Sequence, residues 1–250
     1  MKSKIKIVSS SILLLSVLFV CKMSAQTDAI NVIKEHVKFE TDDGYSISAI
    51  IGKPENIVED LPGIILIHQG GSSKEEWGSF FDKLVKQKYI VLAYDVRGHG
   101  GSDKVENIYA LFNDPNSAPH DLYAAFEYLK DYDNVDADRI AIIGASIGAN
   151  LACVGITKLN IKTAVSISAK TSAVENLNRS KDLILKSIFY IASTGDQNGK
   201  RVEWARELYD RTEFPKKFLE VKNSSAHGVS IFKNEPSVKN EIILWLKETL

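Results

Sequence analysis

The chain has 250 residues, with 31 basic and 32 acidic side chains and a formal net charge of −1. Such a balance argues against nucleic acid or an anionic membrane as a partner. The length suits one globular domain with a large core, and the sequence contains no repeat or internal linker that would divide it.

The N-terminus has the pattern of a targeting segment. Three lysines lie among the first six residues, and the apolar stretch over residues 12–21 is too short to span a bilayer. We expect a secretory signal peptide over residues 1–25, cut after Ala25, which leaves a single domain at 26–250 in a secreted or periplasmic protein. Lipid attachment at Cys21 is a weaker alternative, because the two residues before this cysteine are bulky.

Removal of this leader takes away four lysines and no acidic residue, so 27 basic and 32 acidic side chains remain and the net charge becomes −5. No stable membrane span is expected in the mature chain. Cys153 is its only cysteine, so no internal disulfide can form, and an apolar setting predicts a buried small side chain rather than a reactive thiol.

The mature chain begins with a lead-in at 27–34 and a β-hairpin. Residues 37–40 and 45–50 alternate between apolar and polar side chains around a turn at 42–44, which predicts two edge strands. From Gly63 onward, strands alternate with helices, and this order predicts a parallel sheet. The predicted strands cover 63–68, 89–94, 140–143, 163–168, 187–193 and 217–221; the predicted helices cover 74–87, 118–130, a segment after Ser146, 199–209 and 235–249.

The fold class that follows is α/β, with a mostly parallel sheet of about eight strands flanked by helices. Right-handed crossovers place the carboxyl ends of the parallel strands on one edge. The insert at 169–186 has room for about one helix plus loops, so the cap is minimal. An open cleft of this kind favours small soluble esters, or esters presented by a larger molecule, over long lipid chains.

A G-x-S-x-G pattern joins a predicted strand to a predicted helix. Ser146 stands between Gly144 and Gly148, and a serine on such a turn is tolerated only where its neighbours lack bulk. The geometry exposes the hydroxyl beside a helix N-terminus, which suits a nucleophile in acyl transfer. The alternative is a structural turn in an inactive relative, with the serine as a helix N-cap.

A serine nucleophile needs a base, and His227 is the best placed of the five histidines because it follows the last predicted strand. Gly228 gives its backbone freedom to lean toward Ser146. The other four have structural interpretations: His68 and His99 pack loops, His120 opens a helix and His36 lies on the surface.

The base in turn needs a carboxylate that fixes its tautomer. Asp196 follows the penultimate strand, so it reaches the same edge as the histidine, although Gly-Asp is also an ordinary turn sequence. Glu203 and Asp182 are weaker candidates, since one falls inside a helix and the other inside the insert.

Two N–H donors are needed for the developing oxyanion. One is the backbone N–H of Ile147, the residue after the nucleophile. The second comes from the glycine-containing loop after the strand at 63–68; Gly70 is favoured and Gln69 is the alternative. The competing interpretation of this loop is a plain flexible turn.

Together these residues resemble the α/β-hydrolase fold family. Residues 144–148, Asp196 and His227 match its nucleophile, acid and base in type and order, and residues 68–71 are similar to its oxyanion loop, with glutamine where glycine is usual. Residues 95–102 resemble a family loop that braces the nucleophile turn. The general size is similar to dienelactone-hydrolase-like proteins and small carboxylesterases. The resemblance implies hydrolysis of an ester bond without a metal or an organic cofactor.

The predicted function is a secreted serine hydrolase that cleaves carboxylic esters of small molecules through an acyl-enzyme. The alternatives are a serine peptidase acting on short peptides and a ligand-binding protein that keeps the fold without catalysis. Four aromatic side chains either line the cleft or belong to the core: Trp77, Phe80, Phe81 and Phe112.

Overall fold

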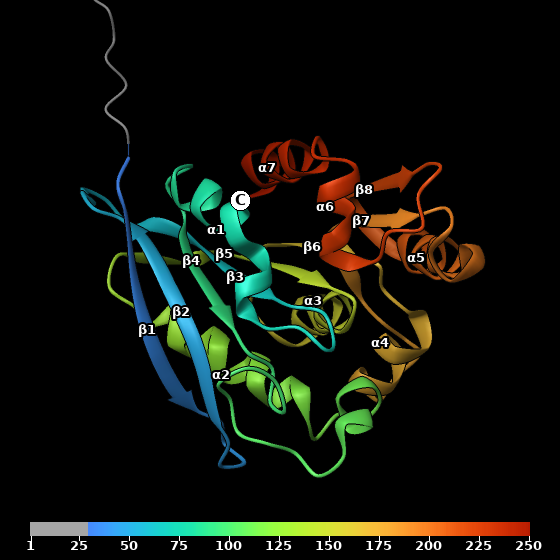
Figure 1. Ribbon diagram of the computed structural model, residues 1–250, viewed down its shortest axis with the longest axis horizontal. Helices are drawn as coiled ribbons and strands as arrows, with labels where there is room; N and C mark the ends of the chain where they lie inside the picture. Colours follow the sequence, from blue (N-terminus) through green and yellow to red (C-terminus); the bar gives the residue numbers. More distant parts are fainter. Residues whose placement is uncertain (1–29) are drawn as a thin grey trace, which may run out of the picture.

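A single mixed sheet runs through residues 30–250, the part of the chain that this computed structural model describes (Figure 1). The predicted signal peptide lies outside the described residues. Eight strands are present within the described part: β1 (Val32–Glu40), β2 (Ser46–Pro54), β3 (Leu61–Ile67), β4 (Ile90–Tyr94), β5 (Val135–Ala145), β6 (Thr163–Ile167), β7 (Leu185–Ser193) and β8 (Thr212–Val221). Their order is β1-β2-β4-β3-β5-β6-β7-β8. The β1–β2 and β2–β4 pairs are antiparallel and the other pairs are parallel, which confirms the predicted fold class.

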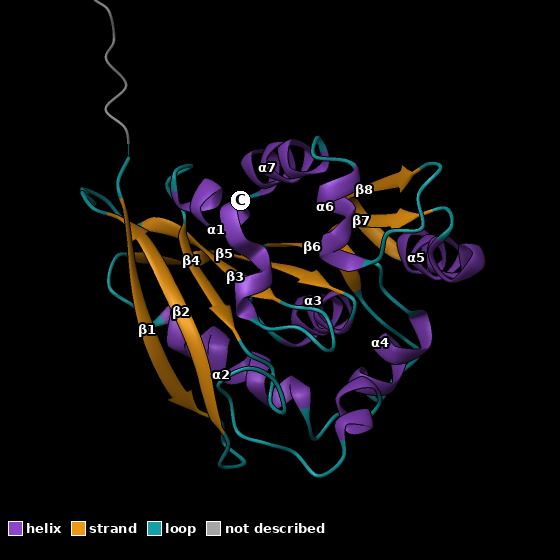
Figure 2. Ribbon diagram, viewed as in Figure 1, coloured by secondary structure: helices purple, strands orange, loops and turns teal. Residues whose placement is uncertain are grey.

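The helices flank this layer of strands on both sides, as Figure 2 shows. They are α1 (Gly78–Val85), α2 (Ala118–Lys130), α3 (Ile147–Lys158), α4 (Thr171–Asn178), α5 (Lys200–Asp210), α6 (Ile231–Asn234) and α7 (Val238–Thr249). Short 3-10 turns stand at η1 (Lys74–Trp77), η2 (Ile108–Phe112), η3 (Asp196–Gly199) and η4 (Gly228–Ser230). None of the helices in the described part combines the length and apolar character needed to cross a membrane.

Two hydrophobic cores lie on opposite faces of the sheet because successive strand side chains point to opposite sides. Along β3, Ile65 and Ile67 face the core under α2, α3 and α5, while Ile64 and Leu66 face the core under α1, α6 and α7. Cys153 is buried on α3, as expected from its apolar setting, and burial raises the pKa of its thiol to about 11.

The element boundaries differ from the sequence predictions in a few places. β1 takes in part of the expected lead-in, and β2 lies between β1 and β4 rather than at an edge. β8 begins five residues before the predicted strand and contains Pro215. A proline is tolerated there because β8 is the last strand of the sheet, and one of its sides has no partner strand within residues 30–250.

The parallel strands deliver the candidate site residues to one edge of the sheet. His68 follows β3, Ser146 follows β5, Asp196 follows β7 and the loop that carries His227 follows β8. The insert between β6 and β7 contains one two-turn helix, α4, in agreement with the minimal cap that its length predicts.

Candidate active site

Ser146 sits at the turn between β5 and α3 in a strained backbone conformation with a positive φ of 52° and a ψ of −106°. A non-glycine residue held in this region costs about 1–3 kcal/mol, so the surroundings must enforce it. A Cβ on Gly144 would collide with the carbonyl of Gly148, and a Cβ on Gly148 would collide with the carbonyl of Ile67. Both glycines are therefore required by the close approach of the strand and the helix.

The imidazole of His227 and the carboxylate of Asp196 are in direct contact. His227 Nδ1 lies 2.6 Å from Asp196 Oδ2, and the Asp196 side chain is nearly buried while that of His227 is 32 % exposed. The two weaker acidic candidates lie elsewhere: Glu203 is exposed and pairs with Lys200, and Asp182 is exposed in the insert. Of the three acids considered, Asp196 alone is hydrogen-bonded to the histidine.

The loop that carries His227 lies against the residues around Ser146. A Cβ on Gly228 would stand 3.5 Å from the Cβ of Ala145, and the Gly228 N–H donates to Ser168 Oγ at 3.1 Å. None of the hydrogen bonds among residues 30–250 joins Ser146 Oγ to the His227 ring. The structure thus brings together the predicted acid and base, and it places the predicted nucleophile beside their loop without that hydrogen bond.

The loop after β3 offers one of its two predicted oxyanion donors. The N–H of Gln69 already donates to Glu76 Oε1 at 2.8 Å, whereas the N–H of Gly70 has no partner among the described residues. The Gln69 side chain also accepts a hydrogen bond from the Val229 N–H at 3.1 Å, so it ties this loop to the histidine loop. That contact gives a physical role to this glutamine, which stands where the family that the sequence resembles usually has glycine.

His68 and His99 hold the same loop in place. His68 is fully buried; its Nε2 accepts the Val96 N–H at 2.9 Å and its Nδ1 lies 2.7 Å from the Gln69 carbonyl. Burial lowers the pKa of His68 to about 4, so the ring is neutral at pH 7. His99 Nε2 accepts the Gly71 N–H at 3.0 Å. Both histidines are loop-packing residues, as the sequence indicates.

The loop at 95–102 is held by hydrogen bonds to the η1 segment, α2 and the hairpin turn. Asp95 accepts hydrogen bonds from the Lys74 ammonium at 2.5 Å and from the Gly101 N–H at 2.8 Å. Arg97 donates hydrogen bonds to Asp121 on α2 and to Asp43 in the hairpin turn. None of its hydrogen bonds reaches residues 144–148 within the described chain. Its two charged side chains therefore bind the η1 segment, α2 and the hairpin turn, and support of the nucleophile turn by this loop stays a prediction.

Three oxygen and nitrogen ligands of the kind that bind metals meet at the hairpin turn. Donor atoms of Asp42, Asp43 and His120 lie within 4.8 Å of one another. Both carboxylate oxygens of Asp43 accept hydrogen bonds from Arg97, at 2.6 and 2.8 Å, and His120 contacts Asp42 at 2.5 Å. These groups satisfy one another, and they hold the hairpin turn against α2.

A cavity of about 250 Å³ opens beside Ser146 and is lined in part by α4 and the η2 turn. Phe112 lines it and packs close to Gly70, whereas Trp77, Phe80 and Phe81 are buried in the core under α1. The cleft aromatic is therefore Phe112, which comes from a 3-10 turn inside what the sequence shows only as a long loop. A larger hollow of about 770 Å³ lies between β1 and α2, away from Ser146.

The chain was compared with protein families and with known proteins. A family model described as alpha/beta hydrolase fold matches residues 62–230, more than half of the chain. Among solved structures, the esterase Pf2001 of Pyrococcus furiosus is similar with a TM-score of 0.70 and 22% identity, over 87% of this chain and 93% of that one. The acetyl xylan esterase of Paenibacillus sp. R4 is similar with a TM-score of 0.73 and 15% identity, over 91% and 86%. At these identities the likeness shows a shared fold.

Two curated relatives share sequence with part of the chain. YcjY of Escherichia coli (strain K12) is 31% identical over 132 residues, which are 50% of this chain and 41% of YcjY. The acylamino-acid-releasing enzyme of Sus scrofa is 30% identical over 128 residues, which are 48% of this chain and 16% of that enzyme. The chain thus spans less than half the length of these relatives. By the match at residues 62–230 and the eight-stranded fold, it belongs to the α/β-hydrolase family.

Proposed function

We propose that this protein is a serine hydrolase that cleaves carboxylic esters, with Ser146 as nucleophile, His227 as base and Asp196 as the orienting acid. The observation that carries the proposal is the 2.6 Å contact between His227 Nδ1 and Asp196, formed beside a strained serine turn. A purely structural turn has no need for a histidine and carboxylate pair at the same sheet edge. The likeness in fold to two proteins named as esterases supports the ester class.

The proposed reaction has two steps. His227 Nε2 takes the proton of the Ser146 hydroxyl while Oγ attacks the acyl carbon, and the N–H groups of Ile147 and Gly70 receive the oxyanion. The carbon–oxygen bond to the alcohol then breaks, and the alcohol leaves with the proton from His227. Water repeats the sequence on the acyl-enzyme and releases the acid. This chemistry asks for no metal or organic cofactor.

A peptidase is the second candidate, because one relative is named as an acylamino-acid-releasing enzyme. An amide leaves less readily than an ester, so the two functions separate on matched substrates. The experiment compares 4-nitrophenyl butyrate with butyric acid 4-nitroanilide, using the protein and its Ser146→Ala variant. Turnover of the ester alone, lost in the variant, supports the esterase; turnover of the anilide supports the peptidase.

We also propose that the protein acts outside the cytoplasm, on the basis of the basic and apolar pattern of residues 1–25. Export would remove this leader and leave Gln26 as the first residue. Mass spectrometry of the protein recovered from its native host tests this directly. A mature chain that still carries residues 1–25 contradicts the proposal, and a lipid-modified Cys21 would favour the lipoprotein alternative.

A further inference from the structure

Among the residues that the structure describes, the cavity beside Ser146 is lined by positive charge and by no negative charge. Its charged lining residues are Lys170 and Arg201; the remainder are neutral, mostly amides and hydroxyls such as Asn150 and Ser172. No aspartate or glutamate of the described part of the chain lines it. An ester substrate that reaches Ser146 therefore meets a cationic pocket.

Arg201 is unusual because it is buried without an ionic partner among the described residues. Its side chain lies on α5 and is 8% exposed, and Nη1 donates to the Ser168 carbonyl at 2.8 Å. Nε is buried and has no hydrogen-bond partner within residues 30–250. A guanidinium has five N–H groups, and the hydrogen bonds within the described chain use one of them.

The comparison with Arg97 shows what a buried arginine requires. Arg97 is also buried, and it contacts the carboxylates of both Asp43 and Asp121. Arg201 has no carboxylate contact among residues 30–250. Asp196 is close enough to influence it, but the Asp196 carboxylate already binds His227. Burying a cation without a counter-charge is costly, so a site of this kind calls for an anion supplied from outside.

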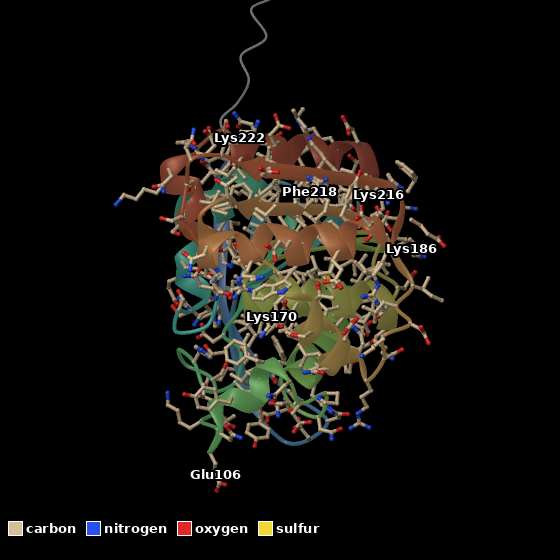
Figure 3. The ribbon with its side chains drawn as sticks, turned by 90° about the vertical axis from the view of Figure 1, so that its right-hand side faces the viewer. Glu106, Lys170, Lys186, Lys216, Phe218 and Lys222 are labelled. Atoms are coloured by element: carbon tan, nitrogen blue, oxygen red, sulfur yellow. The ribbon has the colours of Figure 1, made fainter. Side chains whose placement is uncertain are left out.

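Lys170 and Arg201 converge on the same aromatic ring. The Lys170 ammonium and the Arg201 guanidinium each lie 5.4 Å from the centre of the Trp204 indole. The Thr171 hydroxyl donates to the Trp204 carbonyl at 3.0 Å, which ties the start of α4 to α5. Figure 3 views the molecule from the right-hand side of Figure 1, and Lys170 lies near the middle of that face, below α5. Both cations thus contact Trp204, and both line the cavity.

We propose that the substrate carries a carboxylate and that Arg201, assisted by Lys170, binds it in the cavity beside Ser146. This inference rests on the proposed function and names its substrate class: esters with a carboxylate on the acyl or the alcohol side. The planar guanidinium matches a carboxylate with two parallel hydrogen bonds, and Lys170 adds a point charge. Arg201 determines specificity here and takes no part in the bond-breaking step.

The experiment uses two matched pairs of substrates. Mono-4-nitrophenyl adipate is compared with 4-nitrophenyl heptanoate for the acyl side, and 4-acetoxybenzoate with its methyl ester for the alcohol side. We expect kcat/KM to be at least about tenfold higher for the charged member of one pair, since a tenfold preference corresponds to about 1.4 kcal/mol. Arg201→Gln should erase this preference, and Arg201→Lys should keep part of it.

Arg206→Gln is the matched control, because it removes the same charge from the same helix. Arg206 is exposed and stacks on Phe218, with its guanidinium 3.8 Å from the ring centre and outside the cavity. It should leave the substrate preference unchanged. On the unmodified protein, adipate should inhibit hydrolysis of 4-nitrophenyl acetate competitively, while the uncharged adipamide should not.

The outcomes separate the two proposals. If the charged member is not preferred in either pair, or if Arg201→Gln loses activity equally on both members, the carboxylate assignment is overturned. Equal inhibition by adipate and adipamide also overturns it. In each of these cases neutral esters are still hydrolysed, so the proposed function stands. If the protein hydrolyses none of the four substrates, the proposed function itself is overturned.

Discussion

Asp196 Oδ2 lies 2.6 Å from His227 Nδ1 although 31 residues separate them in the chain. Two backbone hydrogen bonds join their loops: the Thr194 N–H donates to Val221 at 3.0 Å and the Gly195 N–H donates to Ser224 at 2.7 Å. The contact is therefore fixed by the backbone of the β7 and β8 ends. With Nδ1–H directed at the carboxylate, the imidazole keeps Nε2 as the nitrogen that can accept a proton.

Replacing Asp196 by Asn should lower kcat for ester hydrolysis by roughly 10³-fold or more, because the amide no longer fixes the tautomer or stabilises the imidazolium. Steady-state kinetics with 4-nitrophenyl acetate measure this. Glu203→Gln is the control: Glu203 is exposed and pairs with Lys200, so its removal should leave kcat within about twofold. A large loss in the control with full activity in Asp196→Asn would reverse the assignment of the acid.

Gly148→Ala should destabilise the protein by about 3 kcal/mol, because the added methyl meets the Ile67 backbone carbonyl, which cannot move without disturbing β3. Gly155 lies further along the same helix, α3. The methyl group added by Gly155→Ala meets the end of the Ile142 side chain, which can rotate away. That variant should cost less than half as much. Urea unfolding of both variants measures the difference, and equal costs would show that the turn is not tightly packed.

His68 should make stability depend on pH between about 6.5 and 4. Its pKa falls to about 4 in the folded protein because burial disfavours the charged ring, while the unfolded chain binds the proton near 6.5. Between pH 6.5 and pH 4 the unfolded chain therefore binds a proton at His68 that the folded protein does not bind. The free energy of unfolding falls over this range. This linkage amounts to about 3 kcal/mol.

The variant His68→Gln removes that linkage. Its stability difference from the wild type should shrink by about 3 kcal/mol between pH 7 and pH 4, as measured by urea unfolding at several pH values. His36→Gln is the matched control, because His36 is exposed on β1 and has no buried ring to protect. A constant difference between wild type and His68→Gln across this range would show that the ring is protonated inside the fold.

The sequence was sufficient to predict the sheet and the residues at its edge. Runs such as Ile140–Ile143 predict buried parallel strands, and chain order alone sends Asp196 and His227 to the edge that carries Ser146. The predictions failed where long-range packing decides local structure. The 3-10 turn with Phe112 and the early start of β8 around Pro215 have no local pattern, because their neighbours in space come from distant segments.

The positive charge of the cavity also could not be predicted from the sequence. Arg201 lies in a helix with a mixture of charged residues, and nothing in the pattern distinguishes it from the exposed Arg206. Its burial depends on the α4 segment and on the Ser168 carbonyl, which the β6 end places beside α5. The role of Gln69 was hidden in the same way, since its partner Val229 is 160 residues away.

The most direct test of the central claim is covalent labelling with a fluorophosphonate probe, followed by mass spectrometry of the peptides. A reactive nucleophile at the β5–α3 turn predicts a single adduct on Ser146, formed with loss of esterase activity and absent from Ser146→Ala. An unlabelled Ser146, or a Ser146→Ala variant that keeps its activity, would contradict it.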